Sequence, residues 1–253
     1  MSRARKSAGR RLDRFAKWLL KFRIIAIPAV KIANSSTAWS FISRTDRIRA
    51  NRLRDRIKQE ALPEHISIIM DGNRRFAWNE SVEKNIGHAR GKEKLKEVMD
   101  WILDLEIKYF TVYALSTENI SERDPDELDA LYDLYVKGLN EIAADSRIHS
   151  KGVKVQAIGR TELLPDRVKK AIQQAESKTA KYSNYLFTVC LAYGGREEIV
   201  DAVRRVASEH ASGDLALEEI NTQQISERLY TANLPDPDLV IRTSGEERIS
   251  NFL

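Results

Sequence analysis

From Pro63 to the end of the chain, short apolar runs alternate with longer amphipathic segments. The short runs are rich in β-branched and aromatic residues, which predicts five strands at 66–70, 109–115, 153–158, 186–193 and 239–241. The longer segments predict helices at about 89–106, 126–149, 165–182, 197–210 and 222–230. Strands that alternate with helices indicate an α/β fold, a single domain with a mostly parallel central sheet flanked by helices.

The first of these helices carries a clear apolar stripe. Leu95, Val98, Met99, Ile102 and Leu105 recur at helical spacing. Such a stripe normally packs against the interior of a protein. We therefore expect these residues to form core, and not a cofactor site.

The first 60 residues have a different composition and predict a separate, basic N-terminal helical arm. Residues 1–58 hold 17 Lys/Arg and three acidic residues, a net charge of +14, whereas the whole chain carries only +5. Residues 43–60 read as a charged helix, which Leu62-Pro63 ends. The domain boundaries that we predict are 1–60 for the arm and 61–253 for the folded domain.

Apolar residues of the arm, such as Trp18 and Leu19, are interleaved with lysines and arginines. Such a segment is a candidate for peripheral contact with an anionic membrane surface. No uncharged run reaches the roughly 18 residues that a spanning helix needs, and no nucleic-acid-binding module is recognisable. With Cys190 as the one cysteine, the sequence favours a cytoplasmic protein, peripheral at the membrane if the arm binds lipid.

The residues that follow the predicted strands are unusually polar. After the first come Asp71-Gly72-Asn73-Arg74-Arg75, and after the second Ser116-Thr117-Glu118-Asn119. Gly194-Gly195-Arg196 follows the fourth strand and 242–251 the last. Ligands of open parallel sheets bind beyond these strand ends. Several arginines beside an acid suit two phosphate groups and a metal, with Asp71 as a ligand for Mg²⁺.

Other common chemistries find no support in the sequence. There is no Walker motif, no dinucleotide-binding fingerprint and no Gly-x-Ser-x-Gly elbow. The four histidines show no zinc-ligand spacing. Nucleotide kinases, nicotinamide enzymes and hydrolases of the serine-elbow type are therefore disfavoured.

Five segments, taken together and in order, resemble the motifs of the cis-prenyltransferase family, the undecaprenyl and dehydrodolichyl diphosphate synthases. They are 70–77, 87–91, 116–119, 193–196 and 238–252. The Asn73-Arg74-Arg75 form of the first motif is more similar to archaeal or eukaryotic members than to bacterial ones. The resemblance implies a Mg²⁺-dependent homodimeric enzyme that condenses isopentenyl diphosphate onto an allylic diphosphate. The expected product is a long polyprenyl diphosphate for a glycosyl-carrier lipid, made from geranylgeranyl or farnesyl diphosphate.

The resemblance also implies roles for residues near the first strand. Asp71 matches the essential acid that is linked to metal and diphosphate. His88 matches a histidine beside the allylic diphosphate, and Lys84 stands where many members have arginine, which keeps the charge but loses the bidentate fork. The cradle of the allylic diphosphate matches Gly72, Asn73, Arg74, Arg75 and Phe76.

Roles for the later motifs follow in the same way. The loop of Ser116, Thr117, Glu118 and Asn119 matches the segment for substrate alignment and proton removal, with Asn119 as the acceptor. The isopentenyl diphosphate site matches Arg242, Arg248, Ile249 and Ser250. Glu246 and Glu247 are expected to pair with nearby arginines, and Arg196 to form a structural ion pair or to serve the start of a helix.

The chain departs from the family pattern in two places. After Asn119 the family has an aromatic residue and then an arginine, whereas this chain has Ile120-Ser121-Glu122-Arg123, so either Glu122 or Arg123 takes the arginine's place. In the family, a further segment with a metal-binding glutamate follows the residues at which this chain stops. We therefore expect a C-terminally truncated domain. An inactive or non-catalytic subunit of the same fold is the alternative, and a membrane-surface anion-binding protein is a third reading.

Overall fold

The computed structural model describes residues 52–81 and 83–252, with the side chains of Lys84 and Asn85 left aside. The chain divides into two compact units, residues 1–63 and 64–253. In the first unit, residues 52–57 are helical. The predicted arm, with its expected membrane contact, lies outside the described residues up to residue 51.

The second unit is built on a five-stranded sheet in which every strand pair is parallel, in the order β3-β4-β2-β1-β5. The predicted strands are confirmed to within a few residues. Their bounds are His65–Ile69 for β1, Tyr109–Tyr113 for β2, Val153–Ile158 for β3, Tyr185–Cys190 for β4 and Leu239–Arg242 for β5. The register pairs Ile69 of β1 with Tyr113 of β2 and with Arg242 of β5. The carboxyl ends of these three strands therefore lie next to one another.

The predicted helices are present, with additions. The α-helices are α3 (Asn73–Asn79), α4 (Lys84–Asp104), α5 (Thr117–Glu122), α6 (Pro125–Ala144), α7 (Ser146–Lys151), α8 (Asp166–Thr179), α9 (Gly195–Ser212) and α10 (Thr222–Ser226). Two short 3₁₀ helices, η2 (Thr161–Leu163) and η3 (Leu217–Glu219), complete the elements of this unit.

Two predicted segments differ from the structure. The helix predicted at 126–149 is divided at Asp145, whose extended backbone ends α6 and whose carboxylate accepts the backbone N–H of Arg147 to begin α7. The polar segments after β1 and β2, which lie outside the predicted helices, form the short helices α3 and α5. Side-chain caps from Asp145 and Ser116 begin α7 and α5, and apolar periodicity does not record such caps.

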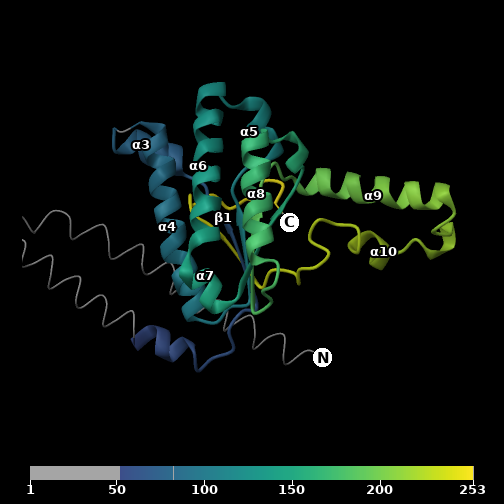
Figure 1. Cartoon of the computed structure of the whole chain (residues 1–253), viewed down its shortest axis with the longest axis horizontal. Helices are drawn as coiled ribbons and strands as arrows, with labels where there is room; N and C mark the ends of the chain where they lie inside the picture. The colour runs from purple at the N-terminus through teal and green to yellow at the C-terminus, as the bar shows by residue number, and fades with distance from the viewer. Residues whose placement is uncertain (1–51, 82, 253) are drawn as a thin grey trace, which may run out of the picture. The chain divides into compact units, whose positions relative to one another are not determined.

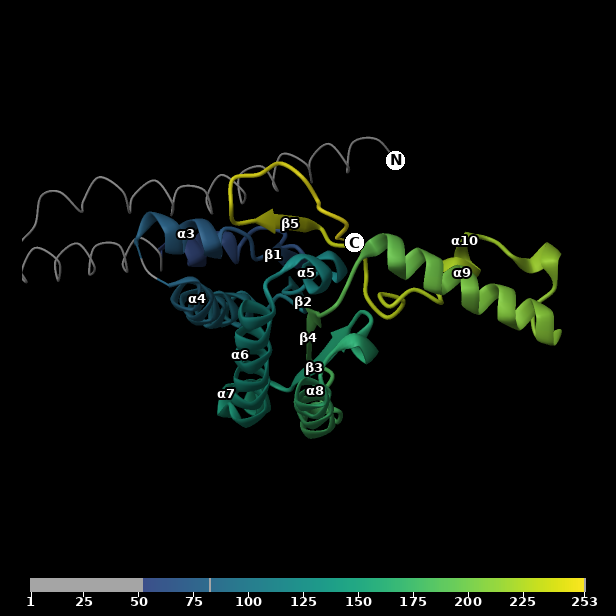
Figure 2. The ribbon, with the colours of Figure 1, turned by 90° about the horizontal axis from the view of Figure 1, so that it is seen from above.

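Helices α4, α6 and α8 pack side by side along the sheet, as Figure 1 shows, and α7 continues from the end of α6. Figure 2 shows α9 extending away from the sheet with α10 beside it. The interior of the sheet is formed by fully buried side chains such as Val112, Phe187 and Leu191. Within the described part of the chain, no helix combines the length and apolar character required to cross a bilayer.

Candidate active site at the carboxyl ends of the strands

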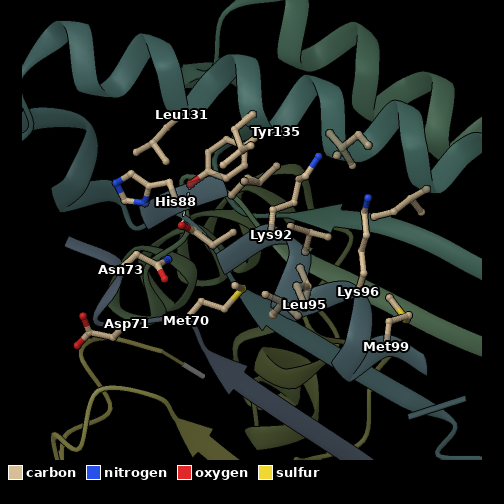
Figure 3. Close-up of a pocket in the computed structure, with 18 of the residues that line it drawn as sticks. Met70, Asp71, Asn73, His88, Lys92, Leu95, Lys96, Met99, Leu131 and Tyr135 are labelled. Atoms are coloured by element: carbon tan, nitrogen blue, oxygen red, sulfur yellow. Dashed lines mark hydrogen bonds between the residues drawn. The ribbon is translucent and has the colours of Figure 1, made fainter. Parts of the chain in front are cut away.

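A cavity of about 690 Å³ opens at the carboxyl end of β1 and continues between the sheet and helices α4 and α6. This volume is within the usual range of small-molecule sites. Figure 3 shows Asp71, Asn73 and His88 at one end of the cavity and Leu95, Lys96 and Met99 at the other. The polar mouth is lined by Asp71, Gly72, Asn73, Arg74, Arg75, His88, Arg123, Glu246 and Arg248.

The wall of the cavity beyond the mouth is mostly apolar. Tyr135 contributes its ring there, while its hydroxyl donates a hydrogen bond to the carbonyl of Ala114 at 2.9 Å. The apolar wall residues come mainly from α4, α6 and the sheet: Leu95, Met99, Leu131, Leu134, Leu139, Ile142, Val112, Phe187, Val189 and Leu191. The charged residues of the wall are Lys92, Lys96, Glu141, Asp145 and Arg147. The expected core role of the stripe is confirmed for Met99, Ile102 and Leu105, which are buried, and Leu95 and Met99 also line this cavity. Apolar periodicity does not distinguish a packed core from the wall of an apolar cavity.

Asp71 lies just beyond β1 at the mouth, and both of its carboxylate oxygens have partners. Oδ1 accepts the backbone N–H of Gly72 at 2.6 Å, and Oδ2 accepts from Nη2 and Nε of Arg242 at 2.6 and 3.1 Å. Partial burial favours the neutral acid, but the hydrogen bonds from Arg242, Ser244 and Gly72 outweigh it and hold the pKa of Asp71 below its usual value. The group is thus an anion at neutral pH.

The chain turns sharply from β1 into α3. Gly72 has φ = +97°, a conformation that side-chain-bearing residues rarely adopt, and α3 begins at the next residue. Asn73 is then held against α4 by two glycines. A Cβ on Gly87 would lie 2.5 Å from the carbonyl oxygen of Asn73, and one on Gly91 would lie 2.8 Å from its amide atoms. The spacing of Gly87 and Gly91 thus permits close approach of α3 and α4.

The arginines at the mouth are paired with acidic residues but remain open to solvent. Arg75 lies 3.7 Å from Asp71 and 3.3 Å from Glu246, and Glu246 also lies 3.6 Å from Arg248. The side chains of Arg75 and Arg248 are 56% and 65% exposed. Exposed pairs of this kind contribute little to stability, so these guanidinium groups are accessible to an anionic ligand. The expected pairing of Glu246 with nearby arginines is confirmed.

The segment after β2 is organised by Ser116, which caps α5 by accepting the backbone N–H of Asn119. The side-chain amide of Asn119 donates to the Ser116 hydroxyl at 2.6 Å, and its oxygen accepts from Nε of Arg123 at 2.8 Å. Arg123 lines the cavity, whereas Glu122 is exposed to solvent. Of the two residues left open by the sequence, Arg123 is the one at the site.

Glu127, which sequence reasoning missed, lies behind the mouth in the first turn of α6. Its Oε1 is 2.8 Å from Nη1 of Arg123, 3.4 Å from Nε2 of His88 and 3.6 Å from Nε of Arg74. Burial lowers the pKa of His88, and the hydrogen bond to Glu127 only partly offsets this effect. The sequence offered one weak indication of this residue: Glu127 follows Arg123 by four positions near the start of a predicted helix, a spacing that favours an ion pair.

The last segment closes the site from the other side. Nη1 of Arg242 donates to the carbonyl of Arg248 and to the hydroxyl of Ser250. Asn251, with φ = +60°, accepts the backbone N–H of Gly195 on its carbonyl and that of Arg196 on Oδ1. Its Nδ2 lies 3.0 Å from both Glu118 and Glu197. The expected role of Arg196 at the start of a helix is confirmed.

Seven of the predicted residues line the cavity mouth: Asp71, Gly72, Asn73, Arg74, Arg75, His88 and Arg248. Phe76 is 37% exposed and its ring lies under the guanidinium of Arg90. Lys84 begins α4. Ile249 is 60% exposed. Six further predicted residues do not line the cavity: Ser116, Thr117, Glu118, Asn119, Arg242 and Ser250. Two of them contact the mouth, Arg242 through Asp71 and Asn119 through Arg123.

Among the described residues, no group of three or more His, Cys, Asp or Glu side chains is arranged to enclose a metal. Mg²⁺ does not require such a cage, because it commonly binds one or two carboxylates together with substrate phosphates and keeps several waters. Asp71, an anionic carboxylate beside several arginines at the mouth, fits that mode of binding. Asp71 and the nearby arginines would hold Mg²⁺ together with a bound diphosphate, and not Mg²⁺ alone.

Comparison with known proteins agrees with this geometry. The family model described as "Putative undecaprenyl diphosphate synthase" matches residues 69–253. Two archaeal relatives, from Pyrococcus horikoshii and Methanopyrus kandleri, are named tritrans,polycis-undecaprenyl-diphosphate synthase (geranylgeranyl-diphosphate specific). They are 49% and 48% identical over 79% of this chain, and the matches cover 75% and 74% of their own lengths.

A similar solved structure is that of lavandulyl diphosphate synthase from Lavandula x intermedia in complex with dimethylallyl diphosphate. It has a TM-score of 0.70 and 33% sequence identity, and the match covers 76% of this chain and 81% of that one.

Proposed function

Because the chain belongs to the cis-prenyltransferase family, we propose that it elongates an allylic diphosphate with isopentenyl diphosphate units, each added with a cis double bond. One observation carries the proposal: a polar mouth with an acid and several arginines opens into a cavity whose wall is mostly apolar. The mouth suits a diphosphate, and the apolar wall suits a hydrocarbon chain.

The primer that we propose is geranylgeranyl diphosphate, with farnesyl diphosphate as the weaker candidate. The two archaeal relatives carry the geranylgeranyl specificity in their names. The product would be a long polyprenyl diphosphate, the precursor of a glycosyl-carrier lipid.

The arrangement at the mouth supports the following chemistry. When the allylic C–O bond breaks, its electron pair leaves with the diphosphate, and Arg74 and Arg75 stabilise the negative charge that develops. The double bond of isopentenyl diphosphate then forms the new C–C bond. The cation that results then loses a proton through Asn119, the expected acceptor, and the proton ends on the released diphosphate, the stronger base. Mg²⁺, held by Asp71 together with the diphosphate, would add Lewis-acid stabilisation of the leaving group.

We assign the second diphosphate to the segment after β5. Arg242 is fixed between Asp71 and Ser250, and Arg248 reaches the cavity. The segment therefore presents its cationic groups beside the allylic site, and holding both substrates in register contributes to the rate by proximity. We propose that Ile249 and Ser250 also contact isopentenyl diphosphate.

We also propose that the chain forms a homodimer. Helix α9 exposes Ile199, Val200 and Val203, with exposed fractions of 55%, 45% and 49%. Neighbouring exposed apolar side chains are typical of interaction surfaces. Light scattering after size-exclusion chromatography should give twice the mass of the chain, and Val203→Glu should shift the protein toward the monomer. A monomer at every concentration would reject the dimer.

The direct test of the function is a turnover assay. Purified protein with Mg²⁺, labelled isopentenyl diphosphate and geranylgeranyl diphosphate should form a long polyprenyl diphosphate. Comparison with farnesyl and dimethylallyl diphosphate would establish the primer. Failure to form product with every primer would reject the enzyme assignment and favour the inactive-subunit alternative.

A further inference from the structure

Glu127 is a buried carboxylate on which three elements of the mouth converge. Its side chain is 5% exposed, and it projects from the first turn of α6. The single oxygen Oε1 contacts a residue of α3, a residue of α4 and the residue that ends α5: Arg74, His88 and Arg123. Glu127 itself does not line the cavity, whereas these three partners do.

The shortest of these contacts, between Glu127 and Arg123, leads on to Asn119. Arg123 donates from Nη1 to Glu127 and from Nε to Oδ1 of Asn119, both at 2.8 Å. A guanidinium is planar and rigid, so the two hydrogen bonds fix its plane and, with it, the orientation of the Asn119 amide. Because Asn119 also donates to Ser116, its side chain is held at both ends. Glu127 is the buried anchor of this series of contacts.

A buried carboxylate is costly unless it is paired, and removal of its charge changes the site electrostatically as well as sterically. With Glu127 neutral, Arg74 and Arg123 would keep their positive charges and gain freedom of orientation. An anionic diphosphate would then be attracted at least as strongly as before. The catalytic geometry, however, would be less well defined.

We propose that Glu127 is a positioning residue. It holds Arg123 and, through Arg123, the side chain of Asn119 in a fixed orientation relative to His88 and Arg74. The proposal rests on the prenyl-transfer function proposed above. Glu127 would affect the rate of the reaction rather than the binding of the diphosphate, because it contacts Arg74, His88 and Arg123 without lining the cavity itself.

The test compares Glu127→Gln, which keeps the shape but removes the charge, with the native full-length chain. We expect kcat to fall on the order of 10- to 100-fold, the loss typical of misplaced reacting groups, while KM for the allylic diphosphate stays equal or decreases. A merely structural role would lower the fraction of active protein and leave KM unchanged with a proportionate loss of stability. Asp129→Asn is the matched control, because Asp129 is an exposed carboxylate of the same helix that pairs with Arg167.

A second readout does not depend on turnover. The pH titration of His88 in ¹⁵N-histidine-labelled protein should show a lower pKa in Glu127→Gln than in the native chain, since Glu127 favours the charged imidazole and Arg123 and Arg74 oppose it. Affinity for the unreactive analogue geranylgeranyl thiolodiphosphate should be equal or higher. If Glu127→Gln is unstable, Glu127→Asp, which retracts the charge by one methylene, should lower kcat in the same way.

Unchanged kcat together with an unchanged His88 titration would overturn the positioning role. A raised KM with unchanged kcat would overturn it too, because Glu127 would then serve binding. If the native chain forms no product, the proposed function fails, and the His88 titration and analogue affinity still decide whether Glu127 organises the mouth.

Discussion

Arg242 donates two hydrogen bonds to a single carboxylate oxygen of Asp71, at 2.6 and 3.1 Å, although 171 positions separate the two residues. The contact follows from the sheet, because β1 and β5 are neighbours whose register places Ile69 opposite Arg242. It joins the proposed metal-binding acid to the proposed isopentenyl diphosphate site. The two substrate sites are therefore electrostatically linked before any ligand binds.

The first prediction concerns this acid. Asp71→Asn should lower kcat by at least about 100-fold, because it removes the charge that would hold the metal-bound diphosphate. Stability should change little: about 1 kcal/mol, or roughly 2–4 °C in melting temperature for a chain of this size. Turnover assays and thermal unfolding followed by circular dichroism measure both quantities.

Asp166→Asn is a suitable control for that substitution, since Asp166 is an exposed carboxylate that pairs with Lys169 at the start of α8. It should keep full activity. Retention of activity by Asp71→Asn would reject the metal and diphosphate role of Asp71.

Close approach of α3 and α4 gives a second prediction. Gly87→Ala should destabilise the protein by about 1–3 kcal/mol, the usual cost of overpacking, because its Cβ would meet the carbonyl oxygen of Asn73 at 2.5 Å and backbone cannot easily move. Gly138→Ala in α6 is the matched comparison. Its Cβ would meet Lys92 at an ordinary 3.8 Å, so this change should stabilise the protein by about 0.5–1 kcal/mol.

Urea unfolding of the two variants provides the measurement. Equal effects of the same sign would show that α3 does not pack on α4 at Gly87. The comparison is informative because both substitutions add one methyl group to a helix.

The sequence was sufficient to predict the sheet and the position of the site, for an identifiable reason. Runs such as 109–115 have enough β-branched and aromatic residues to define strands, and parallel sheets bind ligands at one edge. The predicted cluster of Asp71 with Arg242 follows from that rule. Two partners of Glu127, by contrast, come from α3 and α4, and only tertiary packing brings Arg74 and His88 to it. Asp145 was also decisive, because its cap divides the expected long helix into α6 and α7.

A third prediction uses the buried histidine of β1. His65 is 1% exposed; its Nδ1 lies 2.7 Å from the carbonyl of Pro235, and its Nε2 lies 2.8 Å from the Thr111 hydroxyl. Burial lowers the pKa of His65 below its ordinary value of 6.5, although Pro235 and Asp238 oppose this change. Below about pH 6.5 the unfolded chain therefore takes up a proton that the folded chain resists. The resulting stabilisation is fully present above that pH and is lost as the pH falls.

The free energy of unfolding, measured by urea titration at several values between pH 7.5 and 5, should thus decrease as the pH is lowered. His65→Gln should reduce this slope, whatever its effect on absolute stability. An identical slope in the variant and the native chain would show that His65 does not contribute to the pH dependence.

The final prediction concerns Asn251, which connects the segment after β5 with the starts of α5 and α9. Its Nδ2 donates to Glu118 and Glu197, and its positive φ suits asparagine better than most other residues. Asn251→Asp would keep the backbone conformation but place a third carboxylate between two others. We expect a loss of about 1–3 kcal/mol in stability, because two donors disappear and like charges are brought together. Turnover should also fall, since Arg242 and Ser250 lie on the same segment.

Asn184→Asp separates this effect from the general effect of adding a charge. Asn184 is exposed, and its side chain donates one hydrogen bond to the carbonyl of Lys151. Its substitution should cost less than about 1 kcal/mol, the usual net value of one exposed hydrogen bond. Chemical denaturation near pH 8 would show the contrast, and lowering the pH toward 4 should restore stability to Asn251→Asp as the carboxylates become protonated. Loss of stability that did not respond to pH would mean that Asn251 acts through packing alone, and not through the two glutamates.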